Sequence, residues 1–407
     1  MLRRRELIKS LGLGSLAAGF PGLMFANTPG DRPGDSPGDD TRLVVVILRG
    51  AMDGMAMLAP YGDGNYAGLR GQLALASPGM EDGVLKADGL FGIHPALQHT
   101  HTLYQQKQAL FVHAVASPYR ERSHFDGQDQ LENGSNEGNY RRDGWLNRAI
   151  QPMNSRQGSE SAIAISQNTP LLLRGSEAVT SWAPSSMPDA DDDTLIRLES
   201  LYANDPFFAT RLQQALDSRQ IAGGMSDSKK RRGNQQKQWE ELMRATARFL
   251  SAPNGPRIAV LESGGWDTHA RQGAANGSLA GNFSVLDMGI SILQRDLGDT
   301  WSKTVVMVVT EFGRTVKVNG TGGTDHGTAT AALLVGGAVN GGRIVADWPG
   351  LSTANLYQGR DLYPTTDIRS VFKGVMAEHM GLQEKFLDQN VFPDAKTVQM
   401  IENLVKA

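Results

Sequence analysis

The feature that most constrains this chain is a set of short, continuous apolar runs rich in β-branched residues. Such runs are typical of strands that are buried on both faces of a parallel sheet. A segment with apolar residues at helical spacing from Phe283 to Leu297 connects the third run to the fourth, so the two runs and the helix form a βαβ unit. The sequence therefore predicts an α/β fold, with a large, mostly parallel sheet flanked by helices. The runs are Leu43–Leu48, Ala109–Ala116, Arg257–Leu261, Thr304–Val309 and Ala331–Val335.

The chain around these strands divides into a leader, a tether and one large domain. Residues 1–26 have a basic start, a short apolar stretch and a small-residue end, which is typical of a secretory signal. Within them, Arg4-Arg5-Glu6-Leu7-Ile8-Lys9 resembles a twin-arginine signal. Residues 27–41 repeat Pro-Gly-Asp three times and predict a solvated linker. The α/β domain is expected over residues 42–407, with a helical insertion near 190–250.

This organisation gives expectations about location. We expect the folded protein to be exported by the twin-arginine machinery to the periplasm or another extracytoplasmic compartment. We expect no stable membrane span, because the apolar part of the leader is too short to cross a bilayer. Residues 61–90 and 134–190 are rich in Gly, Ser and Pro, and they are expected to form loops above the carboxyl edge of the sheet.

The composition of the chain excludes several kinds of chemistry. Among 407 residues there is no Cys, so disulfides, thiolate zinc sites, Cys-ligated iron–sulfur clusters and thiol nucleophiles are excluded. The formal charge of −3 gives no reason to expect nucleic acid as a partner. A redox enzyme is disfavoured, since no Gly-x-Gly-x-x-Gly follows a strand. Any metal or acid–base chemistry must therefore come from Asp, Glu, His, Ser and Thr.

Polar residues follow four of the predicted strands. In open α/β sheets ligands bind beyond the carboxyl ends of the strands, so these residues are expected to meet at one edge. Carboxylates and neutral imidazoles suit divalent metals, Zn or Mn where His contributes and Mg or Ca where oxygen ligands dominate. Six residues could hold one or two such ions, namely Asp53, Asp267, His269, Glu311, Asp325 and His326.

The same residues have a more ordinary interpretation. Asp and His in Gly-rich loops often cap helices or satisfy loop amides. Ser123 in particular is a candidate N-cap, with Asp126 in the capping-box position. That role is compatible with catalysis, because a helix N-terminus also lowers the pKa of a nucleophile and favours an incoming anion.

Four motifs carry a resemblance to a known family. They stand in order behind the twin-arginine signal, and the match runs from about Leu43 to Gly381. The chain resembles the bacterial "domain of unknown function 1501" family, which is grouped with the alkaline phosphatase and sulfatase-like superfamily. The resemblance implies an alkaline-phosphatase-like sheet, two metal sites at its carboxyl edge and a Ser, Thr or formylglycine nucleophile. The motifs are Arg122-Ser-His-Phe-Asp-Gly-Gln-Asp129, Gly265-Trp-Asp-Thr-His269, Glu311-Phe-Gly-Arg314 and Gly323-Thr-Asp-His-Gly327.

The resemblance also implies roles for single residues. Asp53 would be the metal ligand after the first strand, and Ser123 would be the nucleophile. A metal would be held by Asp267, His269 and His326, while Glu311 stands where the superfamily usually has an Asp.

The chain departs from the superfamily pattern at several positions. Phe312 follows Glu311 where the superfamily usually has a His, and Phe cannot bind a metal. His124 stands beside Ser123 and competes with it for the role of reacting group. Arg314 or Arg122 could replace a second metal as the clamp for an anion. The absence of Cys excludes the usual Cys-derived formylglycine.

The leading hypothesis is a metal-dependent hydrolase of phosphate or sulfate esters, with a small anionic or saccharide-linked ester as its substrate. The competing hypothesis is a non-catalytic binding or assembly protein that kept the sheet and lost the chemistry, as the departure at Phe312 would allow.

Overall fold

The fold is described by a computed structural model that covers residues 40–136, 141–157, 161–184, 192–202, 205–222 and 235–406. The chain divides into two units, Met1–Ser36 and Pro37–Ala407, and the description below concerns the second unit. The predicted leader and all but the last two residues of the predicted tether lie outside the described residues.

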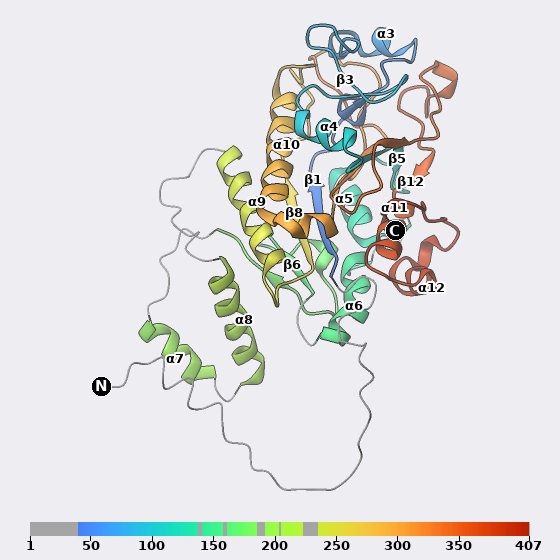
Figure 1. The fold of residues 1–407 in the computed structure, drawn as a ribbon. Coiled ribbons are helices and arrows are strands. Elements are labelled where there is room, and N and C mark those ends of the chain that lie inside the picture. Colours follow the sequence, from blue (N-terminus) through green and yellow to red (C-terminus); the bar gives the residue numbers. More distant parts are fainter. Residues whose placement is uncertain are drawn as a thin grey trace. The chain divides into compact units, whose positions relative to one another are not determined.

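Nine strands form one sheet, with β1 near its centre (Figure 1). Their order is β11-β5-β10-β9-β1-β8-β6-β7, and β12 pairs with β5. Every pairing is parallel except the two made by β10. The predicted α/β fold with a mostly parallel sheet is therefore confirmed. The strands are β1 (Arg42–Leu48), β5 (Ala109–Ala116), β6 (Ala162–Ala164), β7 (Thr180–Ser181), β8 (Ile258–Ser263), β9 (Thr304–Thr310), β10 (Thr330–Val335), β11 (Arg343–Val345) and β12 (Thr366–Asp367).

Strand β10 runs antiparallel to both of its neighbours, β5 and β9. A parallel pair needs a crossover connection, usually a helix, and the chain between β9 and β10 contains none. Strand β10 therefore begins at the edge of the sheet where β9 ends. This direction places Asp325 and His326, just before β10, at the same edge as Glu311, just after β9.

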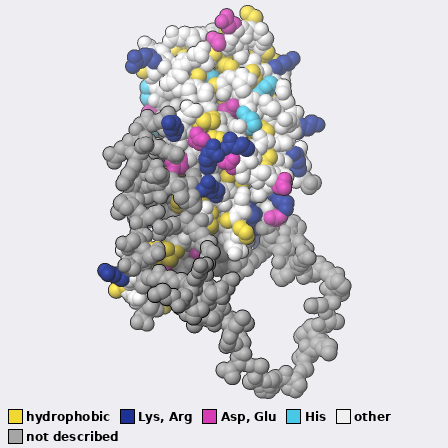
Figure 2. Space-filling model, turned by 60° about the vertical axis from the view of Figure 1, so that its left-hand side comes forward, with side chains coloured by type: hydrophobic (Ala, Val, Ile, Leu, Met, Phe, Trp, Pro, Cys, Tyr) yellow, Lys and Arg dark blue, Asp and Glu magenta, His cyan; other side chains and the backbone are white. Residues whose placement is uncertain are grey.

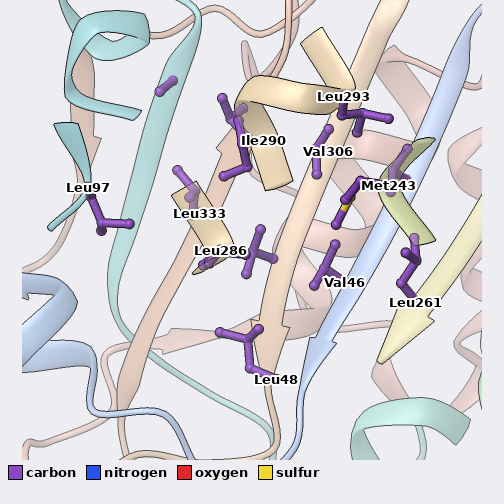
Figure 3. Close-up of a cluster of buried hydrophobic side chains, with 14 of the residues drawn as sticks. Val46, Leu48, Leu97, Met243, Leu261, Leu286, Ile290, Leu293, Val306 and Leu333 are labelled. Atoms are coloured by element: carbon purple, nitrogen blue, oxygen red, sulfur yellow. The ribbon is translucent and has the colours of Figure 1, made fainter. Parts of the chain in front are cut away.

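Helices cover both faces of the sheet. On one face, Leu286, Ile290 and Leu293 of α10 point toward Val46 of β1 and Val306 of β9 (Figure 3). Burial of this apolar stripe is the main force that holds the helix on the sheet. The longer helices of this face and the neighbouring insertion are α4 (Gln98–Gln105), α7 (Asp192–Tyr202), α8 (Pro206–Ala222), α9 (Gln235–Ser251) and α10 (Ser278–Leu297).

The opposite face has its own core. Alternate residues of β1 point toward it, and Trp145 stacks on Phe372 with ring centroids 4.7 Å apart. Two short helices, α2 (Gly54–Met57) and α3 (Tyr66–Arg70), follow β1, and a small sheet contains β2 (Leu58–Ala59), β3 (Leu85–Lys86) and β4 (Gly92–Ile93). The helices on this second face are α5 (His124–Asn133), α6 (Trp145–Gln157), α11 (Ile368–Glu378) and α12 (Glu384–Phe386).

One expectation about the loops is wrong. Residues 134–190 contain helix α6 and strands β6 and β7, which extend the main sheet. Strand β6 is only three residues long, and its fully buried Ala-Ile-Ala stretch is too short to show a periodic pattern in the sequence.

The distribution of charged side chains on the surface is consistent with the small net charge of the chain. On the face in Figure 2, basic and acidic side chains lie next to one another and do not separate into patches of one sign. Among the described residues, no helix has the length and apolar character needed to cross a membrane.

Candidate metal centre

Loops at the carboxyl edge of the sheet bring three histidines and one aspartate together. His124 lies in the first turn of α5, after β5, and Asp267 and His269 lie after β8. His326 lies just before β10. One ligand atom from each of His124, Asp267 and His326 lies within 4.8 Å of the others. We call the four residues His124, Asp267, His269 and His326 the histidine cluster.

The rings of His269 and His326 in the histidine cluster face each other through their Nε2 atoms. His326 Nδ1 lies 2.9 Å from the carbonyl oxygen of Arg122, and His269 Nδ1 lies 3.3 Å from Asp325 Oδ1. Both oxygens can only accept a hydrogen bond, so a proton on the Nδ1 of each ring would satisfy them and leave a lone pair on each Nε2. The two Nε2 atoms are 3.0 Å apart. Asp267 Oδ1 lies within 3.3 Å of both Nε2 atoms. With both Nδ1 atoms protonated, the two Nε2 lone pairs and this carboxylate form a donor set that fits a metal ion.

The third ring is held from its other side. His124 Nδ1 lies 2.8 Å from Glu311 Oε1, and its Nε2 lies 3.3 Å from Asp267 Oδ2. Among the described residues, no group makes a well-aligned hydrogen bond to this buried Nε2. The ring of Phe312 stacks on His124 with centroids 5.1 Å apart, which fixes the plane of the imidazole. Metal-binding histidines usually have this arrangement, with Nδ1 bonded to a carboxylate or carbonyl and Nε2 free.

Asp267 contacts both of the facing rings and is fixed by a buried arginine. Its Oδ1 lies 3.0 Å from His269 Nε2 and 3.3 Å from His326 Nε2. Arg314 donates to the same oxygen at 2.6 Å, and its side chain is fully buried. Partial burial raises the pKa of Asp267, but the hydrogen bond and charge of Arg314 outweigh it and lower that pKa below its ordinary value. Asp267 is therefore an anion near neutral pH.

Glu311 is fully buried, and both of its carboxylate oxygens accept hydrogen bonds from other groups of the protein. Its Oε1 accepts from Gly50 N at 2.9 Å and from Gln128 Nε2 at 3.2 Å, and its Oε2 accepts from Thr310 Oγ1 at 2.8 Å. Burial raises the pKa of Glu311, but hydrogen bonds, with that from His124 first, lower it below its ordinary value. The hydrogen bond to Glu311 in turn raises the pKa of His124, and burial opposes this shift. The geometry makes Glu311 an anchor for His124.

The remaining candidate ligands lie beside the histidine cluster or away from it. Asp325 accepts from Asn319 Nδ2 at 3.0 Å and contacts His269. Asp53 is fully buried, and its described polar partners are the guanidinium of Arg70 and Gln272 Nε2, the latter at 2.7 Å. The structure therefore does not bring Asp53 into contact with the histidine cluster.

The residues considered for reaction and anion binding have separate environments. Ser123 occupies the N-cap position of α5, but its side chain makes no capping hydrogen bond. Its backbone nitrogen donates to Tyr119 Oη at 3.0 Å. Arg122 adopts a left-handed backbone conformation with φ +59°, and its side chain donates to Asp361 Oδ2 at 2.9 Å.

Three polar residues of this region were not expected from the sequence. Gln128 supports Glu311, Asn319 supports Asp325, and Arg70 neutralises Asp53. Gln128 could have been recognised, because it lies four residues after His124 and therefore on the same side of the helix. Nothing in the sequence indicates that Arg70 pairs with Asp53, since the contact depends on how the loops fold over the sheet.

A family model described as "Protein of unknown function (DUF1501)" matches residues 40–392. A search of curated protein sequences gave no match.

Several solved structures are similar to the chain. The phosphonate monoester hydrolase of Agrobacterium radiobacter is 12% identical, with 84% of this chain and 74% of that chain covered and a TM-score of 0.39. The C-terminal periplasmic domain of EcEptC from Escherichia coli, in complex with Zn, is 11% identical, with 93% and 92% covered and a TM-score of 0.41. The lipoteichoic acid synthase LtaP from Listeria monocytogenes is 10% identical, with 78% and 69% covered and a TM-score of 0.34.

Proposed function

The chain belongs to the DUF1501 family, and we propose that it is a metal-dependent hydrolase of phosphate or sulfate esters that uses a single metal site. The observation that carries this proposal is the convergence of three imidazole Nε2 atoms on the carboxylate of Asp267, with each Nδ1 bonded to an oxygen. The proposed ligands are His124, Asp267, His269 and His326.

This donor set favours Zn over Mn, Mg or Ca, because three of the four ligands are imidazole nitrogens and the latter three metals prefer oxygen. The chemistry expected of a bound divalent metal is Lewis-acid stabilisation of negative charge on the ester oxygens. The chain orients the ligands through Glu311, Asp325 and Arg314. Since Arg314 is fully buried against Asp267, we assign it a positioning role and not direct contact with the substrate.

Ser123 is the proposed nucleophile. Its hydroxyl stands at the N-terminal end of α5, one residue before His124, and it is not used for capping. The hydroxyl attacks phosphorus or sulfur, the bond to the ester oxygen breaks, and the released alcohol takes up the proton. Water then cleaves the serine ester, which restores the hydroxyl and releases the inorganic anion. His124 is the alternative reacting group from the sequence, but its contacts favour a role as metal ligand.

The test combines metal analysis with turnover of aryl phosphates and aryl sulfates. We expect about one equivalent of metal in the purified protein, loss of that metal in His326→Ala and Asp267→Asn, and retention in His101→Ala. His101 is a suitable control because its Nε2 contacts Lys86 O, at 3.1 Å, in another part of the fold. Ser123→Ala should keep the metal and lose turnover. A metal-replete protein that hydrolyses neither class of ester would instead favour the binding or assembly role.

We also propose that the protein is exported folded by the twin-arginine route. When Arg4→Lys and Arg5→Lys are combined, the precursor should remain in the cytoplasm of a host that has this machinery. Arg3→Lys keeps the Arg4-Arg5 pair and should not change export. Cell fractionation measures the outcome, and equal export of the double variant would contradict the proposal.

A further inference from the structure

A pocket opens beside the histidine cluster. Its volume is about 520 Å³, which lies within the range of small-molecule sites. The pocket is lined by Gln72, Leu73, Arg271, Gly273, Gly320, Thr321 and Gly322.

The wall of this pocket is continuous with the histidine cluster. Thr321 Oγ1 donates to the carbonyl oxygen of His269 at 2.6 Å. Ala270 and Gly322 form an antiparallel bridge, and Arg271 N donates to Thr321 O at 3.0 Å. The segment that carries His269 into the histidine cluster therefore carries Arg271 into the pocket two residues later. A ligand at the proposed metal site could extend into this pocket.

Arg271 differs from the other arginines around this edge of the sheet. Its guanidinium makes no hydrogen bond or ion pair with any residue that the structure describes, and the residue is exposed. The other guanidinium groups donate to protein acceptors: Arg122 to Asp361, Arg314 to Asp267 and Arg360 to the carbonyl oxygen of His326. Arg271 is thus the guanidinium available for an anionic ligand.

The rest of the pocket offers hydrogen-bonding groups next to apolar surface. The amide of Gln72 lies in one wall, and Leu73 is the single apolar side chain in the lining. Gly322 adopts a left-handed conformation with φ +72°, and a Cβ there would lie 2.8 Å from Gln72 Nε2. Glycine at this position therefore keeps the wall next to the amide open. The Arg271 guanidinium can bind an acidic group through charge-assisted hydrogen bonds, and the neighbouring amide and backbone groups can bond to hydroxyls that flank it.

We propose that this pocket binds an acidic group, a carboxylate or a sulfate, on the saccharide portion of the substrate. The saccharide assignment of the substrate rests on the proposed hydrolase function, whereas binding of an acidic sugar in the pocket can be measured without turnover. The chain has a formal charge of −3, so an anionic sugar would need a local cation such as Arg271 to be attracted.

The binding test compares three sugars that differ only at C6: galactose, galacturonic acid and galactose 6-sulfate. Their binding to the full-length, metal-loaded protein is followed by ligand-observed NMR. We expect the acidic sugars to bind at least tenfold more tightly than galactose, and the stronger of the two identifies the acidic group. Arg271→Ala should weaken binding of the acidic sugars at least tenfold, because it removes a hydrogen bond to a charged group. Arg271→Lys should recover part of it.

Two control variants separate the possible explanations. Lys317 is exposed and lies in the β9–β10 connection, which also supplies Thr321 to the pocket, but Lys317 is not part of the pocket lining. Lys317→Ala should therefore change the affinity for acidic sugars less than twofold. His326→Ala removes a metal ligand and should leave binding of galacturonic acid in the pocket intact. An equal loss in Lys317→Ala and Arg271→Ala, or equal binding of galactose, would overturn the proposal.

Turnover gives a separate readout. Arg271→Ala should lower kcat/KM about tenfold for an ester of an acidic saccharide and leave kcat/KM for an aryl ester unchanged. If no ester is hydrolysed by the wild type but acidic sugars still bind through Arg271, the hydrolase proposal fails and the pocket proposal stands.

Discussion

Phe312 is the residue at which the chain departs most visibly from the superfamily pattern. Its ring is buried and lies 5.1 Å from the ring of His124 and 5.3 Å from that of His326, centroid to centroid. A Cβ on Gly127 would lie 2.9 Å from it, so Phe312 fills its space tightly. Phe312, which cannot bind a metal itself, therefore packs against two of the proposed metal ligands, His124 and His326.

We predict that Phe312→Leu weakens metal binding by roughly tenfold, because loss of a group that orients a ligand costs about 10- to 100-fold in affinity. Competition with a coloured chelator measures the dissociation constant. Phe125→Leu is the matched control, since Phe125 also neighbours His124 but is 84% exposed. If the two variants bind metal equally well, Phe312 has no orienting role.

His379 allows a prediction about pH. The pKa of His379 is lowered to about 4, chiefly by burial and also by the charge of Arg257, although the hydrogen bond from its Nε2 to Arg42 O, at 2.8 Å, raises it. The unfolded chain therefore takes up a proton on this residue near pH 6.5, whereas the folded protein does so only near pH 4. The contribution of His379 to stability is complete above pH 6.5 and is lost as the pH falls toward 4.

His379→Gln removes the imidazole, so the unfolded chain should no longer take up this extra proton between pH 6.5 and 4. We expect the decline in the free energy of unfolding between pH 6.5 and 4 to become shallower by up to about 1.4 kcal/mol per pH unit. Urea unfolding of the chelator-treated protein at several pH values measures it. Chelator treatment avoids the pH dependence of metal binding, and an unchanged slope would show that His379 is already protonated in the folded state.

At the scale of elements, the connection between β9 and β10 determines the site. It carries Glu311, Arg314 and His326, and it folds back on itself where Arg314 and His326 form an antiparallel bridge. Gly327 lies in this tight approach, and a Cβ there would lie 2.4 Å from the carbonyl group of Arg314. The backbone around His326 therefore tolerates no side chain at position 327.

Gly327→Ala should destabilise the protein by about 1–3 kcal/mol, because the added methyl forces the backbone apart, and should also weaken metal binding. Gly281→Ala is the contrasting variant. Gly281 lies in helix α10 with nothing within 4 Å of its Cβ position, so alanine should stabilise by about 0.5–1 kcal/mol. Thermal unfolding and metal titration of both variants provide the check, and equal stability of the two would contradict the steric argument.

The comparison of sequence and structure is also clearest at this scale. The apolar runs predict β1, β5, β8, β9 and β10, since each is long enough to show a continuous buried pattern. The direction of β10 could not be read from its residues, because an apolar run looks the same in either direction. Strands β6 and β7 are too short to give a signal.

For the site, too, some features can be predicted from the sequence and others cannot. Loops after strands predict that His124, Asp267 and His326 lie at one edge, because that follows from topology alone. Which of the candidate carboxylates contacts the imidazoles depends on side-chain partners. Asp53 is paired with Arg70, and that ion pair is formed by residues whose approach no local pattern encodes.

At the scale of the whole molecule, the histidine cluster joins segments that are far apart in the chain. Its residues come from the first turn of α5 and from the β8–α10 and β9–β10 connections. A metal bound there would tie three loops to one point above the sheet. Because such a site exists only in the folded state, the free energy of binding adds to the free energy of unfolding.

We therefore predict that chelation lowers the melting temperature of the protein. A metal present at about 1,000 times its dissociation constant contributes roughly 4 kcal/mol of stability, which EDTA would remove. His326→Ala should already melt at the temperature of the chelated wild type and should not respond to EDTA. His101→Ala should respond as the wild type does, since its ring contacts Lys86 and not the histidine cluster. If EDTA lowers the melting temperature of wild type and His326→Ala equally, the stabilising ion binds elsewhere. If it lowers neither, the histidine cluster does not bind a metal that links these loops.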